Sequence, residues 1–306
     1  MSDAQVHIPA HIRNAPDGTF GDLWLPMPSE PFSPCDDLSC RRSRTTRKIP
    51  AARSASSTTA SDEDLAWRRW LLGHHASFGV WRLLCHILSD SAGHGECDPD
   101  TRPDVHRTLT VAAELFDVYS ALLLYSGACT PEIYAAAIRP RMVACHPAFS
   151  GTWSRDYEQV RALLRPPVPT CEPGVRLKRA VKFNRLVHMA VAKRLVPDGN
   201  SLLRDSGQAG SSPTDGERDL FDTFFRTRRA TICVHEFTGQ LIDRTELILS
   251  DLAVYPVGMR YGRDDLDRFQ AELRGHFERL SVLTGELMTK GRATCPRQNR
   301  QHSPRP

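Results

Sequence analysis

The sequence lacks several features that would assign it to a familiar class of protein. It contains no glycine-rich phosphate loop, no nucleophile elbow and no zinc-protease helix motif. No apolar run reaches the length needed to span a bilayer, and the polar N-terminus carries no apolar signal segment. We therefore expect a cytoplasmic protein without membrane association, and nothing points to nucleotide binding or serine-hydrolase chemistry.

Lysine and paired cysteines are also scarce. Only five of the 40 basic residues are lysines, and the net charge of +4 is too mild to indicate a nucleic-acid partner. The nine cysteines are odd in number and form no Cys-x-x-Cys pair. This usage is typical of buried free thiols in a reducing compartment.

The chain divides by composition into a folded domain with two polar ends. Residues 1–60 are rich in Pro, Ser, Asp and Arg without periodicity, and they predict a mobile, disordered N-terminal arm. Residues 291–306 predict a similar tail. The domain between them, residues 61–290, has enough apolar residues to build a core, and a homodimer is compatible with it.

Helical periodicity dominates this domain, and no comparable strand pattern occurs. A capping sequence at Ser61–Asp64 opens the first helix, which runs to Leu88. Further helices are predicted near Pro103–Gly127, from Thr130 toward Met142, and over about 155–164, 175–196, 217–252 and 264–289, with a Gly/Ser loop at 198–216. The expected fold is all-α, a single helical bundle.

Histidines on apolar faces of three separate helices are the strongest chemical signal. They are the His74/His75 pair, His188 and His235. A single buried histidine usually has only a structural role, but neutral imidazoles that face a bundle core are what a haem iron requires. The alternative is a helical binding protein in which these histidines are core residues and the basic stretch 41–53 contacts an acidic partner.

Two segments resemble a known superfamily of haem enzymes. His75, Phe78, Val80 and Trp81 are spaced as in the distal-histidine helix of the tryptophan dioxygenases. The later order of Tyr134, Arg139-Pro-Arg-Met142, His146-Pro-Ala-Phe-Ser-Gly151, Trp153 and Asp156-Tyr157 is similar to the haem-dependent L-tyrosine hydroxylases of that superfamily. The resemblance covers about residues 62–255.

The resemblance implies a tryptophan dioxygenase-like fold with the haem between helices. It selects His75 as the distal catalytic residue, whereas periodicity places His74 at the centre of the apolar stripe. It implies a late proximal ligand, for which His235 is the first candidate and His188 the second. Further implied contacts are haem-binding Phe78, Trp81 and Arg228, and substrate-binding Ser150, Trp153, Arg155 and Arg139.

The implied activity is peroxide-dependent hydroxylation of L-tyrosine next to its phenol group, which gives L-DOPA for a secondary metabolite such as an antibiotic. The cofactor would be haem b, because no cysteine lies four residues after His235 or His188 for covalent attachment. The glycine-serine loop of tryptophan dioxygenases is replaced by Gln240–Thr245, so tryptophan cleavage is not expected. Oxidation of an indole or of a modified tyrosine is the alternative enzymatic reading.

Overall fold

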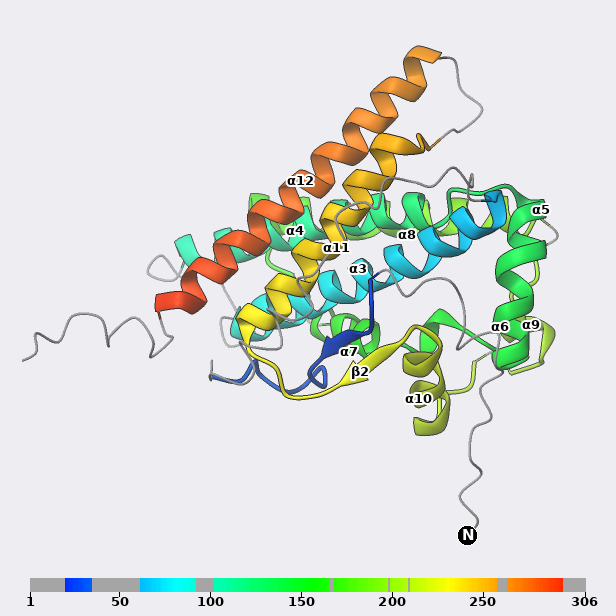
Figure 1. The fold of residues 1–306 in the computed structure, drawn as a ribbon. Helices are drawn as coiled ribbons and strands as arrows, with labels where there is room; N and C mark the ends of the chain where they lie inside the picture. The colour runs from blue at the N-terminus through cyan, green and yellow to red at the C-terminus, as the bar shows by residue number, and fades with distance from the viewer. Residues whose placement is uncertain are drawn as a thin grey trace, which may run out of the picture.

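A computed structural model describes residues 20–34, 61–91, 102–165, 168–197, 199–208, 210–257 and 263–293. The predicted all-α fold is confirmed (Figure 1). Within the described residues, the strands form one two-stranded parallel sheet, in which β1 (Leu23–Leu25) pairs with β2 (Thr227–Arg229). The expected arm and tail fall outside the described residues at 1–19, 35–60 and 294–306.

Two long antiparallel helices form the centre of the domain. In α3 (Asp62–Ser91), the predicted cap is confirmed, since the Asp64 N–H donates to Ser61 Oγ at 3.1 Å. Gly73 of α3 lies so close to α4 (Arg102–Ser126) that a Cβ there would meet Ser126 Oγ at 2.2 Å. The backbones of the two helices therefore approach closely at this level.

Further helices cover both sides of this pair. Helix α8 (Glu172–Leu195) packs along α4, where the Asn184 side-chain amide donates to Ser120 Oγ at 3.1 Å. On the other side, α11 (Val234–Val254) and α12 (Arg263–Ala293) form a hairpin that crosses α3 and α4 diagonally (Figure 1). A buried ion pair at 2.7 Å joins Arg69 of α3 to Asp251 of α11.

The segment predicted as one helix from Thr130 to Met142 contains a π-helical turn. It comprises α5 (Pro131–Ile133), the π-helix η1 (Tyr134–Ile138) and α6 (Arg139–Cys145). The Arg139 N–H bonds to Tyr134 O, five residues earlier, and the next residue is Pro140, which has no N–H to donate. Such a turn accommodates a proline without ending the helix.

The remaining elements are short, and one prediction among them is wrong. They are η2 (Gly151–Trp153), α7 (Arg155–Leu163), α9 (Leu202–Asp205) and α10 (Asp215–Phe224). The expected long helix over 217–252 is in fact α10, β2 and α11. It is interrupted because Arg226 adopts a positive φ of 52° and the next residues pair with β1.

The expectation of a mobile arm is also wrong for residues 20–34. Leu23 and Leu25 are buried in the core, and the Leu23 N–H donates to Arg226 O at 3.0 Å. The sequence did not indicate this strand, because two apolar side chains in a short run carry no periodic signal. Their burial depends on pairing with a strand about 200 residues later. This pairing fixes the N-terminal strand beside the region between α10 and α11.

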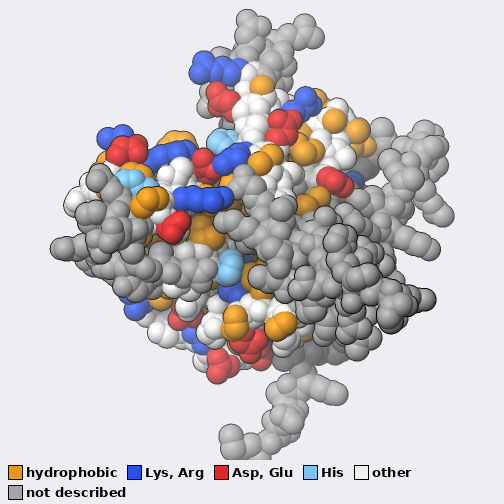
Figure 2. All heavy atoms as spheres, turned by 90° about the vertical axis from the view of Figure 1, so that its left-hand side faces the viewer, with side chains coloured by type: hydrophobic (Ala, Val, Ile, Leu, Met, Phe, Trp, Pro, Cys, Tyr) orange, Lys and Arg blue, Asp and Glu red, His pale blue; other side chains and the backbone are white. Residues whose placement is uncertain are grey.

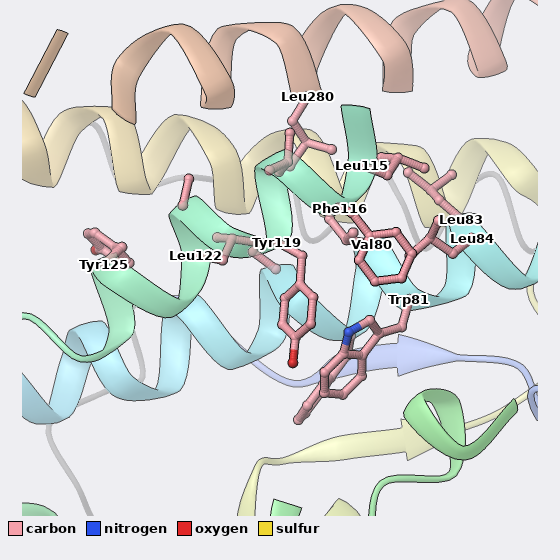
Figure 3. Packing of buried hydrophobic residues seen from close by; sticks show 14 of the residues in the cluster. Val80, Trp81, Leu83, Leu84, Leu115, Phe116, Tyr119, Leu122, Tyr125 and Leu280 are labelled. Atoms are coloured by element: carbon pink, nitrogen blue, oxygen red, sulfur yellow. The ribbon is translucent and has the colours of Figure 1, made fainter. Parts of the chain in front are cut away.

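One part of the core lies between α3 and α4, as Figure 3 shows for Trp81, Phe116 and Tyr119. By length and composition alone, α4 could cross a membrane, contrary to the absence of such a run expected from sequence. Most of that helix is buried against α3 and α8, as in the core helix of a soluble protein, and so its composition is weak evidence for a membrane span.

Candidate functional site

His75 lies in the core with both ring nitrogens engaged. Its Nε2 is 2.5 Å from Phe225 O, and its Nδ1 is 3.3 Å from Arg244 Nε. Because a carbonyl only accepts and a guanidinium only donates, Nε2 carries the proton and Nδ1 is the acceptor. Burial and the charge of Arg244 lower the pKa of His75, which keeps the ring neutral. The distal role implied for His75 is not supported, since neither nitrogen is available to a ligand.

Arg244 is the second residue that holds His75 in place. It lies in the Gln240–Thr245 segment, which replaces the glycine-serine loop of the tryptophan dioxygenases. Its guanidinium is buried and also donates to Gln240 O at 3.1 Å and to Asp22 O at 2.9 Å. Burial lowers the pKa of Arg244 to about 10. His75 is thus tied through Arg244 to the backbone of the N-terminal strand.

His74, the neighbouring residue, has a different environment. It is half-buried, and its Nδ1 lies 2.6 Å from Trp70 O, to which it donates. Nε2 therefore carries the lone pair, and no hydrogen bond to it occurs within the described residues. Burial lowers the pKa of His74 to about 4, against the effect of Trp70 O and with a further contribution from His188. His74 is a neutral imidazole with one nitrogen available.

Aromatic rings fix the plane of the His74 imidazole. Phe225 stacks on it with a centroid distance of 4.5 Å and an interplanar angle of 16°, and Trp70 lies at 4.4 Å. Tyr134 of η1 meets Trp70 edge-on at 5.8 Å. Phe225 contacts both histidines, because its carbonyl accepts from His75 while its ring stacks on His74. The hydrogen bond from His75 therefore holds Phe225, and the Phe225 ring orients His74.

His188 of α8 lies close enough to His74 for its charge to lower the pKa of His74. Its side chain reaches solvent, yet the surrounding protein lowers its own pKa by desolvation. Gly73 abuts Ser126 and Gly127 abuts Val191, so His74 and His188 flank the same end of α4. The structure therefore brings His74 together with the second candidate ligand.

His235, the first candidate ligand, lies elsewhere. Helix α11 runs antiparallel to α3, with Leu241 against Gly79 and Arg244 against His75. His235 precedes Arg244 by nine residues, which corresponds to about 13 Å along the helix axis. This offset places His235 toward the opposite end of α3, so it does not face His74, and its assignment as the proximal ligand stays a prediction.

Arg228 also differs from its predicted place. The expected helix face shared with His235 does not exist, because Arg228 lies on β2. Its side chain is mostly exposed and forms an ion pair with Asp22 at 3.1 Å. The predicted contact with a haem propionate therefore has no structural support.

The four predicted substrate-binding residues all bond to, or pack against, other residues of the protein. Arg139 pairs with Asp205 at 2.8 Å, and Arg155 pairs with Asp222 at 2.9 Å and with Asp219 at 2.8 Å. Ser150 caps η2 by accepting from the Thr152 N–H, and Trp153 is buried against His146 and Phe149. Both guanidiniums are therefore already neutralised by carboxylates.

An ion-pair network that the sequence did not predict holds the Ser150–Trp153 turn in place. Arg229 bonds Asp156 at 2.7 Å and Asp222 at 2.7 Å. Burial alone would lower the pKa of Arg229, but the two carboxylates more than offset this effect and raise it. The network joins α7, α10 and β2.

An aromatic cluster connects the turn with His74. Phe149 is 5.6 Å from Trp153 and 6.0 Å from Phe225, whose ring stacks on His74. The predicted haem contacts Phe78 and Trp81 are buried on the same helix. Phe78 packs 5.2 Å from Phe225, and Trp81 contacts Tyr119 (Figure 3).

The residues of this site that could hold a haem iron are His74 of α3 and His188 of α8. Two neutral imidazoles come from separate helices, and His74 has the backbone acceptor that ligating histidines use to fix their tautomer. The sequence did not assign Trp70, Phe225 and Arg244 to the site, and it gave Tyr134 only as part of the segment that carries the resemblance. The apolar stripe marked the face of Trp70, but nothing local marked Arg244.

A family model described as SfmD 3-methyl-L-tyrosine peroxygenase matches residues 21–182, more than half of the chain. The match includes the N-terminal strand, His74 and His75 of α3, and the segment from Tyr134 to Tyr157. It ends before His188 and His235. No curated protein sequence matches the chain.

Proposed function

Because the chain belongs to the SfmD 3-methyl-L-tyrosine peroxygenase family, we propose that it hydroxylates L-tyrosine next to the phenol group. Family membership makes it a haem-dependent oxidoreductase that uses peroxide on a tyrosine-type substrate. In the proposed reaction, hydrogen peroxide inserts one oxygen atom into the ring C–H bond, and water and L-DOPA are released. Membership of this enzyme family argues against the alternative of a non-enzymatic binding protein.

In this proposal His74 would hold the haem iron, and His188 would move the proton of the peroxide. His74 fits the iron ligand because its Nδ1–H is held by Trp70 O, leaving Nε2 to coordinate. Bound haem supplies the iron centre that activates peroxide. His188, kept neutral by its lowered pKa, accepts a peroxide proton at a ring nitrogen and returns it to the departing oxygen.

His188→Ala tests the proton-transfer role. We expect turnover to fall by about 10²–10⁴-fold while the protein still binds haem, since this is the usual contribution of a positioned acid or base. Val282→Ala, an exposed residue on α12, is the matched control and should leave turnover unchanged. Full turnover in His188→Ala would remove His188 from the mechanism.

We propose haem b bound without a covalent link. The residues four positions after His74, His188 and His235 are Phe78, Ala192 and Gly239, and none of these offers a thiol. Acidified acetone should therefore extract all of the haem from the protein. Haem retained on the denatured polypeptide would contradict this assignment.

The family description favours 3-methyl-L-tyrosine as a second candidate substrate. A pocket distinguishes ligands that differ by one methyl group by about tenfold or more. We expect kcat/KM with peroxide to be higher for L-tyrosine than for 3-methyl-L-tyrosine by about that factor. The reverse order would reject L-tyrosine as the substrate and leave the family-level activity unchanged.

A further inference from the structure

The outward face of α8 carries an apolar stripe with no cover among the described residues. Phe183, Leu186 and Met189 are 55%, 57% and 58% exposed. Their three-residue spacing makes each of them the neighbour of the next on the helix surface. The opposite face, with Leu177, Asn184 and Val191, packs into the domain. Single exposed apolar residues are common on monomers, whereas a continuous exposed stripe marks an interaction surface.

The same face is strongly basic. Five exposed cations border the stripe, and none has an ion-pair partner within the described residues: Lys178, Arg179, Lys182, Arg185 and Lys193. The acidic residue of α8 is Glu172, in its first turn. By contrast, the face in Figure 2 shows charged side chains of both signs interspersed. The stripe with its border of cations is called the α8 face below.

We propose that the α8 face docks an acidic amphipathic helix of a partner protein. Apolar side chains of that helix would cover Phe183, Leu186 and Met189, as ridges of one helix pack against another. Its carboxylates would meet the unpaired cations next to and between the stripe residues. The complementary charge favours the encounter and fixes the orientation of the helix.

Charge argues against a second copy of the chain as the occupant of this face. A second copy of the chain would bring the same five cations against each other, which opposes a symmetric contact on this surface. An anionic bilayer would also be attracted by these cations, and the vesicle measurement below distinguishes it from an acidic helix.

The test uses the full-length, haem-loaded protein and labelled synthetic peptides. The probe is a helical peptide with Leu at positions i, i+3, i+4 and i+7 and mainly Glu elsewhere. Controls are a scrambled peptide of the same composition and a peptide with Lys in place of Glu. Fluorescence anisotropy should give the probe a Kd at least about tenfold lower than either control, a difference of about 1.4 kcal/mol.

The variant Phe183→Ser/Leu186→Ser should weaken binding of the probe at least about tenfold. Val282→Ser, at a residue 51% exposed on α12, is the matched control and should not change it. Circular dichroism confirms that each variant is folded. Equal binding of the scrambled peptide, or no effect of the double variant, would overturn the proposal.

Two further outcomes would replace the proposed partner with another occupant. Light scattering could show a dimer that Phe183→Ser/Leu186→Ser dissociates, and a second copy would then cover the face. The protein could bind phosphatidylserine vesicles more tightly than it binds the peptide, and the same variant could abolish the binding to vesicles. This result would indicate a membrane surface. Either result would overturn docking of an acidic helix.

Discussion

The two sides of α3 differ in how completely their polar groups are used. On the side toward α11, His75 is bonded through both nitrogens and Arg69 is paired with Asp251. On the side toward η1 and α8, His74 keeps one nitrogen without a partner in the described part of the chain. Adjacent residues of one helix thus have different roles. The side of His75 stabilises the fold, and the side of His74 has a ring nitrogen available to a ligand.

The largest effect should come from the buried ion pair on the paired side. Asp251→Ala leaves the Arg69 guanidinium buried without its carboxylate and also removes the acceptor of the Tyr125 hydroxyl, which donates at 3.1 Å. We expect the free energy of unfolding to fall by about 3–5 kcal/mol, measured by urea denaturation. Glu272→Ala, which breaks the exposed pair with Arg268, is the control and should cost less than about 1 kcal/mol.

The next effect separates the two histidines by stability. His75→Ala leaves the Arg244 Nε and the Phe225 carbonyl buried without partners, which should cost about 2–4 kcal/mol. His74→Ala leaves one backbone carbonyl short of a donor and should cost about 1 kcal/mol. Urea unfolding of the haem-free proteins measures both values. Equal losses would mean that the two sides of α3 do not differ as described.

A smaller effect is expected at the start of α10, which is followed directly by Phe225, the ring that stacks on His74. Thr214 accepts from the Glu217 N–H, and the Glu217 carboxylate accepts from the Thr214 N–H, forming a capping box. Thr214→Ala should reduce the free energy of unfolding by about 1 kcal/mol. Thr214→Ser, which keeps the hydroxyl, should restore most of it, and a loss in both variants would point to another role for Thr214.

Local patterns predicted most helices because each has a repeating apolar face and a recognisable end. Helices α4, α7 and α8 lie within a few residues of their expected ranges. The interruption between Phe224 and Val234 was not predictable, since no Gly or Pro marks it. It depends on the pairing of β2 with Leu23–Leu25, a contact between distant parts of the chain that no local window contains.

The site was predictable as a set of residue types but not as a geometry. Periodicity placed His74 at the centre of its stripe, which agrees with its available nitrogen, whereas the resemblance selected His75. His235 lies on an apolar helix, as expected, but its position along α3 depends on how α11 is offset against that helix. A sequence pattern defines the face of a helix and not this offset between helices.

The most direct test is the absorption spectrum of the haem-loaded protein and of its His74→Ala, His75→Ala and His235→Ala variants. Spectra of the ferric form and of the ferrous carbon monoxide complex should be recorded for each. We predict that the histidine-type spectrum is lost in His74→Ala and kept in His75→Ala and His235→Ala. A spectrum that survives in His74→Ala and is lost in His235→Ala would contradict the proposal that His74 holds the haem iron.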